Sequence, residues 1–281
     1  MDMNIKSTIT LNNGIKMPVF GFGVWQIKDG QDVTNAVGEA IKTGYQLIDT
    51  AAIYENEKGV GEALKGTKRE EIFVTTKVWN EEQGYDTTLK ACENSLKRLG
   101  LDYVDLYLVH WPVAGKLNDT WKAMEKIYES KLARAIGVSN FYEYHLREIL
   151  KTAQIKPSVN QIEIHPVLSQ KETREFCKKE NIAIEAYSPL GRAKILNIPQ
   201  IAAIAKKYGK TPAQVILRWH LQNDIIPIPK SLHAERIREN ADIFDFELNQ
   251  QEIATIDALN RNEKAIKGVF FKFDEHKSVI L

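Results

Sequence analysis

Short apolar runs alternate with longer segments of helical periodicity along almost the whole chain, and this alternation constrains the fold more than any other feature. The pattern is typical of repeated βα units around a parallel sheet. Candidate strands are residues 19–21, 46–48, 72–76, 104–109, 133–138, 159–162, 183–186 and 225–227. Eight such units favour closure into an α/β fold of the (β/α)8 TIM barrel type, although periodicity alone would also permit an open doubly wound sheet.

The segments between these runs are predicted to be amphipathic helices that cover the sheet. In residues 87–99, apolar side chains recur at steps of three and four, which is the spacing of one helix face. That face consists of Leu89, Cys92, Leu96 and Leu99.

Both ends of the chain carry additions to the barrel. Residues 8–16 alternate around Asn12-Asn13-Gly14, and Asn-Gly is a strong signal for a tight turn, so we predict an N-terminal β-hairpin that plugs one end. After the eighth strand the chain continues through residues 235–240 and 250–259, where we predict an extra C-terminal helix. The aromatic tail at residues 268–273 is too apolar for a simple solvated end, so we expect it to fold back on the body.

Composition limits the partners and the compartment. We expect residues 1–281 to form a single domain, since no linker divides them. With 38 Lys and Arg against 37 Asp and Glu, the net charge of +1 creates no long-range field that would attract nucleic acid or a membrane surface.

The N-terminus lacks a secretory signal and no run is long enough for a membrane span, so the expected location is cytoplasmic. Only Cys92 and Cys177 are present, and we expect two reduced thiols and no metal site.

Polar residues follow seven successive candidate strands. Since active sites of such barrels gather at the carboxyl ends of the strands, these exits are the first candidates for chemistry. Taken singly, each has an ordinary explanation: Asp49 could cap a helix, Lys77 could be solvated, and His110 could be a core histidine. An acid, a lysine and a histidine at consecutive strand ends are harder to explain by packing alone. We therefore predict a polar site at one mouth of the barrel.

Several motifs occur in a fixed order along the chain, from Asp49-Thr50-Ala51 through Thr75-Thr76-Lys77 to Ile228-Pro229-Lys230-Ser231. Together with residues 105–112, 136–141 and 159–161, they closely resemble the aldo-keto reductase family. The resemblance implies an oxidoreductase that reduces aldehydes and ketones to alcohols with NADPH. The short connections after strands four and seven resemble bacterial members that act on small dicarbonyls, such as methylglyoxal and glyoxal, and on keto sugars. Aromatic aldehydes are further candidate substrates.

The resemblance also implies a catalytic tetrad of Asp49, Tyr54, Lys77 and His110, with Tyr54 as proton donor. A free tyrosine has a pKa of about 10, so it is protonated at neutral pH but needs help to carry the charge left after donation. A lysine cation about 4 Å away stabilises a phenolate by roughly 4 kcal/mol at an effective dielectric near 20. Asp49 would hold Lys77 in place, and His110 would orient the carbonyl oxygen.

The glycines of residues 21–23 do not form a dinucleotide-binding turn, because the third glycine and the ribose acid of that motif are absent. By resemblance, the cofactor lies extended across the barrel mouth, beginning near Gly23 and Val24. The residues implied for its successive groups are Ser139, Asn140 and Gln161 for the carboxamide, Tyr187 for stacking on the nicotinamide, Ser188, Pro189, Leu190 and Gly191 for the pyrophosphate, Lys230, Ser231 and Arg236 for a 2′-phosphate, and Glu239 and Asn240 for the adenine. Two cations and a hydroxyl suit a phosphate, which favours NADPH over NADH.

Trp25, Trp79 and Trp111 follow strands one, three and four, and they could wall a pocket for a small-molecule carbonyl substrate. Core packing is the alternative for each of them. The chain departs from the usual family pattern at Ser130-Lys131 and in the phenylalanine-rich tail. We expect the protein to act as a monomer.

Two other functions are compatible with a barrel fold. A barrel isomerase or hydrolase is one, and a non-catalytic NADPH-sensing subunit is the other. Metal-dependent hydrolysis is disfavoured because the sequence has no His-x-His or His-Glu-x-x-His ligand set. The intact tetrad disfavours a purely sensing role.

Overall fold

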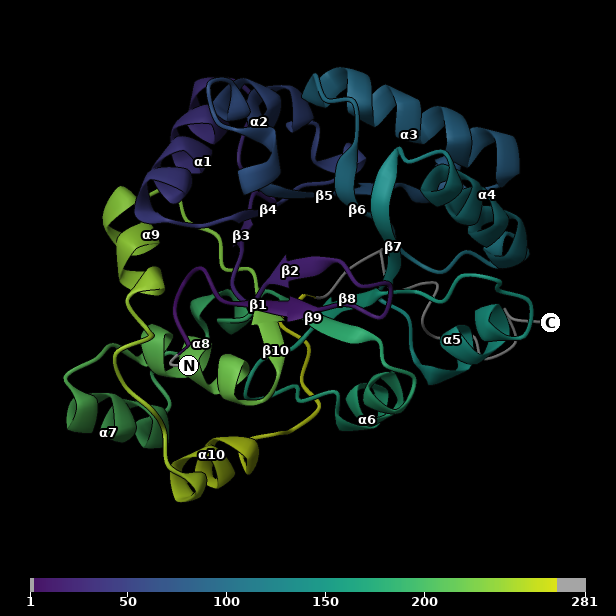
Figure 1. Ribbon diagram of the computed structural model, residues 1–281. Helices are drawn as coiled ribbons and strands as arrows, with labels where there is room; N and C mark the ends of the chain where they lie inside the picture. Colours follow the sequence, from purple (N-terminus) through teal and green to yellow (C-terminus); the bar gives the residue numbers. More distant parts are fainter. Residues whose placement is uncertain (1–2, 267–281) are drawn as a thin grey trace.

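A computed structural model describes residues 3–266 and shows eight parallel strands curled around a common axis (Figure 1). In chain order they are β3 (Phe22–Gly23), β4 (Leu47–Asp49), β5 (Phe73–Val78), β6 (Val104–Val109), β7 (Ala133–Ser139), β8 (Val159–Glu163), β9 (Ala183–Tyr187) and β10 (Ile225–Pro227). Each strand pairs with its neighbour in the sequence. The first and last strands also meet, because the N–H groups of Gly21 and Gly23 donate to the carbonyls of Pro227 and Pro229, both at 3.1 Å. The predicted barrel is confirmed.

Helices surround these strands on the outside. They are α1 (Gln31–Thr43), α2 (Glu57–Leu64), α3 (Tyr85–Leu99), α4 (Leu117–Glu129), α5 (Glu143–Leu150), α6 (Lys171–Lys179), α7 (Pro199–Tyr208), α8 (Pro212–Gln222), α9 (Ala234–Ala241) and α10 (Gln250–Asp257). Helix α3 buries Cys92, Leu96 and Leu99 on the face that the sequence predicted, with Leu89 partly buried beside them. Helices α9 and α10 lie in the two segments that follow the last predicted strand, so the predicted extra C-terminal helix is confirmed. The predicted aromatic tail, residues 268–273, lies outside the described residues.

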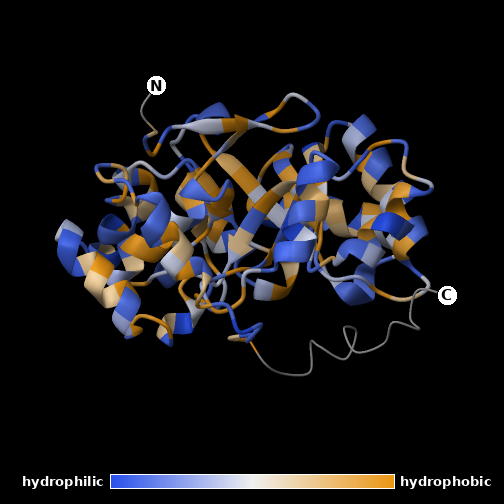
Figure 2. Ribbon diagram, turned by 90° about the horizontal axis from the view of Figure 1, so that it is seen from below, coloured by the Kyte–Doolittle hydropathy of each residue, from blue (hydrophilic) through white to orange (hydrophobic). Residues whose placement is uncertain are grey.

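A β-hairpin covers one end of the barrel. Strands β1 (Thr8–Thr10) and β2 (Lys16–Pro18) pair antiparallel, and the hairpin lies across the barrel axis in Figure 1 and at one end of the molecule in Figure 2. Leu11 and Met17 of this hairpin are buried against barrel residues that include Leu47 and Leu106. The predicted plug is confirmed.

The position predicted for the first barrel strand is wrong. Residues 19–21 are not a strand, and β3 begins at Phe22. The reason is that the Val19 N–H donates to the Ser7 carbonyl at 3.0 Å, so the chain here still follows the hairpin. The other seven predicted strands are displaced by at most two residues at their ends.

The barrel interior changes character along the strands. Near the hairpin it is filled by apolar side chains, including Leu47 on β4 and Val159 on β8. Two residues further along the same strands, and therefore on the same face, are Asp49 and Gln161. Buried polar side chains thus gather at the carboxyl ends of the strands, which is where the sequence placed the site.

None of the described helices is long and apolar enough to cross a membrane. Cys92 and Cys177 are buried free thiols, as expected. Within residues 3–266, no group of three or more His, Cys, Asp or Glu side chains is arranged to hold a metal ion.

Candidate active site

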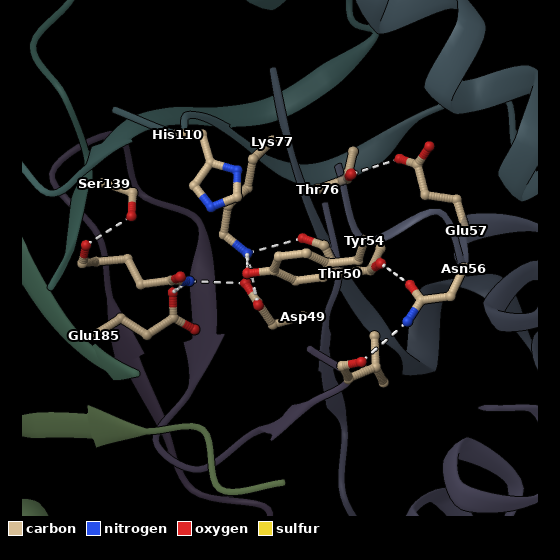
Figure 3. A network of polar contacts seen from close by, with 12 residues as sticks. Asp49, Thr50, Tyr54, Asn56, Glu57, Thr76, Lys77, His110, Ser139 and Glu185 are labelled. Carbon is tan, nitrogen blue, oxygen red and sulfur yellow. Dashed lines mark hydrogen bonds and ion pairs between the residues drawn. The ribbon is translucent and has the colours of Figure 1, made fainter. Parts of the chain in front are cut away.

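Lys77, Asp49 and Tyr54 meet at the carboxyl ends of β4 and β5. The Lys77 Nζ donates to Asp49 Oδ1 at 2.6 Å and to the Thr50 carbonyl at 2.8 Å, and it lies 3.5 Å from Tyr54 Oη. Lys77 is fully buried, whereas Tyr54 is partly exposed. Figure 3 shows the three side chains converging, with His110 beside Lys77. The phenol of a partly exposed tyrosine is therefore held next to a buried ammonium group.

The loop after β4 fixes the position of Tyr54. It forms a short 3-10 turn, Ala52–Tyr54, and Asn56 follows with a fully buried side chain. The Asn56 amide donates to the carbonyls of Val24 and Ile27, at 3.0 and 2.9 Å, and accepts from Thr50 Oγ1 at 2.8 Å. Asn56 therefore ties the tyrosine loop to the loop after β3.

Glu57 holds the same loop from the other side. Its buried carboxylate accepts from Thr76 Oγ1 at 2.6 Å and from Arg98 Nε at 2.5 Å. Thr76 is the neighbour of Lys77 on β5, so this contact couples the tyrosine loop to the strand that carries the lysine. Asn56 and Glu57 thus have a structural role in this loop.

Charges around Lys77 keep it protonated. Burial alone would lower its pKa, but Asp49 above all, and Tyr54 and Glu185 when they are ionised, raise the pKa of Lys77 above its usual value. Burial raises the pKa of Tyr54 to about 12, against the opposing effect of the Lys77 cation. Tyr54 is therefore a protonated phenol at neutral pH.

His110 lies beside both aromatic side chains of the site. Its ring centroid is 5.7 Å from that of Tyr54 and 5.1 Å from that of Trp79, in edge-on arrangements. Burial, and then the Lys77 cation, lower the pKa of His110 well below its usual value. The imidazole is consequently neutral, and its Nδ1 has no hydrogen-bond partner among the described residues.

The residues predicted for the carboxamide form one network with the tetrad. Gln161 Nε2 donates to Asp49 Oδ2 at 2.7 Å, and Ser139 Oγ donates to the Gln161 carbonyl at 2.8 Å. Asn140 Nδ2 donates to the His110 carbonyl at 3.0 Å, and its Oδ1 accepts from Tyr187 Oη at 2.7 Å. The ends of five strands, β4 and β6 to β9, are thereby joined by hydrogen bonds in which a side chain takes part.

Comparisons with known proteins agree with this geometry. Residues 19–261 match the model of the "Aldo/keto reductase family". The chain belongs to this family. It is 55% identical over 266 residues to a glyoxal reductase of Bacillus subtilis (strain 168), covering 94% of this chain and 96% of that protein.

Solved aldo-keto reductases share its fold closely. A Brucella melitensis aldo/keto reductase is 49% identical, with a TM-score of 0.87 over 90% of this chain and 99% of that chain. A Bombyx mori aldo-keto reductase in complex with NADP is 37% identical, with a TM-score of 0.89 over 96% of this chain and 98% of that chain. This aldo-keto reductase is thus an oxidoreductase of carbonyl compounds, as its sequence motifs predicted.

The rim of the aldo-keto reductase barrel carries cations without counter-charges. Lys230 and Arg236 are exposed, and neither they nor Arg192 form an ion pair with a carboxylate within residues 3–266. Partial burial, and then the Arg192 cation, lower the pKa of Lys230. An anionic phosphate would supply the missing charge, so these side chains fit the phosphates of a dinucleotide. The Arg192 guanidinium also lies over the ring of Trp25, in the loop after β3, at 5.5 Å from the ring centre.

The loop after β9 is held in uncommon backbone conformations. Ser188, Arg192 and Ala193 all have positive φ, as does Gly191. Such conformations are costly for residues other than glycine and often occur where a loop must follow a ligand. Pro189 and Leu190 complete this segment, which was predicted to follow the pyrophosphate.

The other predicted cofactor residues differ in how accessible they are. Ser231 and Asn240 are buried, and the exposed Glu239 accepts from Thr211 Oγ1 at 2.9 Å. The Val24 side chain is fully buried, with its N–H bonded to the Asp49 carbonyl. A Cβ on Gly23 would lie 3.0 Å from the Ile228 carbonyl, so a side chain there would crowd the strand beside it.

The three tryptophans predicted for the substrate pocket lie near the tetrad to different extents. Trp79 is partly exposed and contacts the His110 ring. Trp25 is partly exposed under Arg192, whereas Trp111 is 8% exposed and its carbonyl accepts from Gln83. Trp79 is therefore held directly against a tetrad residue.

Two site residues were not predicted from the sequence. Glu185 lies inside the barrel next to Gln161, and Arg192 lies at the rim. A signal for Glu185 exists: it precedes Tyr187 by two residues on a predicted strand, so the two side chains share a face. Arg192 follows a glycine in a loop and carries no comparable pattern.

Proposed function

We propose that this aldo-keto reductase transfers hydride from NADPH to small aldehydes and ketones, with Tyr54 as the proton donor. The observation that carries the proposal is the 3.5 Å separation between Tyr54 Oη and a lysine ammonium that is itself bonded to Asp49 at 2.6 Å. At an effective dielectric near 20, a cation at that distance stabilises a phenolate by about 5 kcal/mol. This is the assistance that a phenol needs in order to act as an acid near neutral pH.

Each tetrad residue has a separate task in the proposed reaction. Bound NADPH supplies the hydride to the carbonyl carbon. Tyr54 donates its proton to the carbonyl oxygen, and Lys77 stabilises the charge that remains on Tyr54. The neutral His110 ring orients the carbonyl oxygen, because its burial keeps it uncharged next to Lys77. Asp49 holds the Lys77 ammonium in place.

The cofactor preference follows from the rim cations. Lys230 and Arg236, with Ser231 between them in the sequence, would bind the 2′-phosphate that distinguishes NADPH from NADH. Ser139, Asn140 and Gln161 would hold the carboxamide, with Tyr187 against the nicotinamide ring. The NADP bound to the Bombyx mori relative supports NADPH as the cofactor.

Small dicarbonyls are the proposed substrate class, since a relative at 55% identity is named glyoxal reductase. Aromatic aldehydes and keto sugars belong to the wider set to be screened, with Trp25, Trp79 and Trp111 as the proposed pocket walls. We further propose that residues 1–281 act as a single domain, as a monomer, in the cytoplasm. The near-neutral charge of the chain gives no reason to expect nucleic acid as a partner.

Replacement of Tyr54 tests the central assignment. Tyr54→Phe should lower kcat for methylglyoxal reduction by roughly 10²-fold or more, since general acid catalysis contributes about 10² to 10⁴. Binding of NADPH, followed by fluorescence titration, should be unchanged. Tyr208→Phe, which removes a hydroxyl bonded to Glu252 at 2.7 Å on an outer helix, is the matched control and should keep full activity. Equal turnover by Tyr54→Phe and the wild type would refute the role of Tyr54.

A further inference from the structure

A second carboxyl group is buried in the barrel next to the tetrad. Glu185 has no exposed surface, and it stands beside Gln161 in the register of β8 and β9. The Gln161 Nε2 donates to Glu185 Oε2 at 2.6 Å and to Asp49 Oδ2 at 2.7 Å. The other oxygen of Glu185, Oε1, is buried and has no hydrogen-bond partner among the described residues.

This arrangement fixes which way the Gln161 amide points. An ionised Asp49 can only accept hydrogen bonds, so the nitrogen of the amide must face it. The Gln161 amide nitrogen has two hydrogens, and the second is taken by Glu185. Only the side-chain oxygen of Gln161 then remains to accept a hydrogen bond from an amide group of a bound ligand.

We propose that Glu185 is a positioning residue of the reductase, which holds the Gln161 amide against Asp49 in the orientation that receives the cofactor carboxamide. The inference rests on the proposed function, because it assumes that Gln161 binds the carboxamide and that Asp49 supports Lys77. Glu185 touches neither Lys77 nor Tyr54 by a hydrogen bond, so it acts through Gln161.

The charge of Glu185 depends on the groups that face it. These are Asp49 on β4, Lys77 on β5, Tyr54 in the loop after β4 and the neutral Gln161. Burial, and then the negative charge of Asp49, raise the pKa of Glu185 to about 8. Below that pKa the carboxyl is neutral, and this agrees with a buried Oε1 that has no donor among the described residues.

Ionisation of Glu185 opposes the reduction. A negative charge at Glu185 repels Asp49 across the shared amide, and it raises the pKa of Tyr54, which becomes a weaker acid. The kcat for reduction should thus fall as the pH rises through about 8. Between about pH 5 and 8 the folded protein keeps a proton on Glu185 that the unfolded chain has already lost. The free energy of unfolding should therefore decline as the pH rises through this range.

The test is the pH profile of Glu185→Gln, which keeps the shape of the side chain and cannot ionise. The wild type should lose kcat for methylglyoxal reduction with an apparent pKa near 8, and Glu185→Gln should move this alkaline limb upward by about one pH unit or more. Glu185→Gln should also lose less stability in urea between pH 5 and 8 than the wild type does. Glu252→Gln, an outer helix carboxyl that pairs with Lys207, is the control and should keep the wild-type profile.

An unchanged alkaline limb in a folded Glu185→Gln variant, or an unchanged KM for NADPH at pH 7 in a folded Glu185→Leu variant, which cannot accept from Gln161, would overturn the inference. If these variants do not fold, infrared difference spectra of the wild type between pH 7 and pH 9.5 provide the test. A protonated carboxyl band at pH 7 that is lost by pH 9.5 supports the inference, and its absence at pH 7 rejects it. Loss of activity in Tyr54→Phe together with an unchanged limb in Glu185→Gln would reject this inference alone, so the two failures are distinguishable.

Discussion

The two ends of the barrel interior are equally buried but chemically opposite. On β4, Leu47 is fully buried in the apolar core next to the hairpin, and Asp49 is buried at the other end next to Lys77. They are two positions apart along the strand, which corresponds to roughly 6.6 Å. One end is filled by side chains that need no partner, whereas the buried charges of Asp49 and Lys77 at the other end depend on each other.

This difference separates stability from chemistry within one strand. The apolar side chains near the hairpin offer no reactive groups, but their close packing makes the barrel rigid. The buried charges at the mouth are costly to desolvate, and a buried ion pair by itself is weak evidence for stability. Asp49 and Lys77 are therefore better explained by the reaction proposed for them than by a contribution to stability.

Removal of one charge at the mouth should have the largest effect. Asp49→Asn leaves the Lys77 ammonium buried without its counter-charge, which should cost about 3 to 5 kcal/mol of unfolding free energy. The kcat/KM for reduction should also fall by roughly 10²-fold or more, because the orientation of Lys77 is lost. Urea denaturation and NADPH oxidation measure the two effects. The double variant Asp49→Asn with Lys77→Met should regain stability and stay inactive.

A second buried aspartate provides the control for this substitution. Asp105 on β6 accepts from Arg69 at 2.6 Å and from Arg134 at 2.7 Å, away from the mouth. Asp105→Asn should lower stability by about 1 to 3 kcal/mol, since it weakens charged hydrogen bonds, and should leave the turnover unchanged. If Asp49→Asn behaved like Asp105→Asn, the functional contrast between the two acids would be lost.

A cavity in the apolar end should affect stability alone. Leu106 is fully buried in the core near the hairpin, and Leu106→Ala should cost about 2 to 5 kcal/mol of unfolding free energy. Its kcat/KM should equal that of the wild type at 25 °C, as long as the protein remains folded. A large loss of kcat/KM in the folded variant would show that the two ends are coupled.

The smallest expected effect concerns the rim of the mouth. Lys230→Ala and Arg236→Ala should each raise KM for NADPH about tenfold, which corresponds to about 1.4 kcal/mol for an exposed charged contact. The KM for NADH should change little, because NADH lacks the 2′-phosphate. Lys210 is a lysine already paired with Asp242 and Asp245, both at 2.8 Å, so Lys210→Ala is the control and should leave both constants unchanged. An equal rise for both cofactors would remove the phosphate assignment.

Much of the fold and of the central site could be predicted from the sequence. The spacing in residues 87–99 identified α3, and Asn13-Gly14 identified the hairpin, because both signals arise from residues close in the chain. The polar strand exits Asp49, Lys77 and His110 were recognisable because strands of one barrel all end at the same mouth. The structure brings these three together with Tyr54, and the roles proposed for them await the experiments above.

The tertiary structure alone decided which distant groups became neighbours. Glu185 and Asp49 lie far apart in the sequence, and only the curvature of the barrel lets them share the Gln161 amide. The start of β3 was missed because Val19 bonds to Ser7 of the hairpin region, which no local pattern reveals. Local periodicity reports which face of an element is apolar, whereas hydrogen-bond partners and the charge of a buried acid depend on groups that barrel closure brings within a few ångströms.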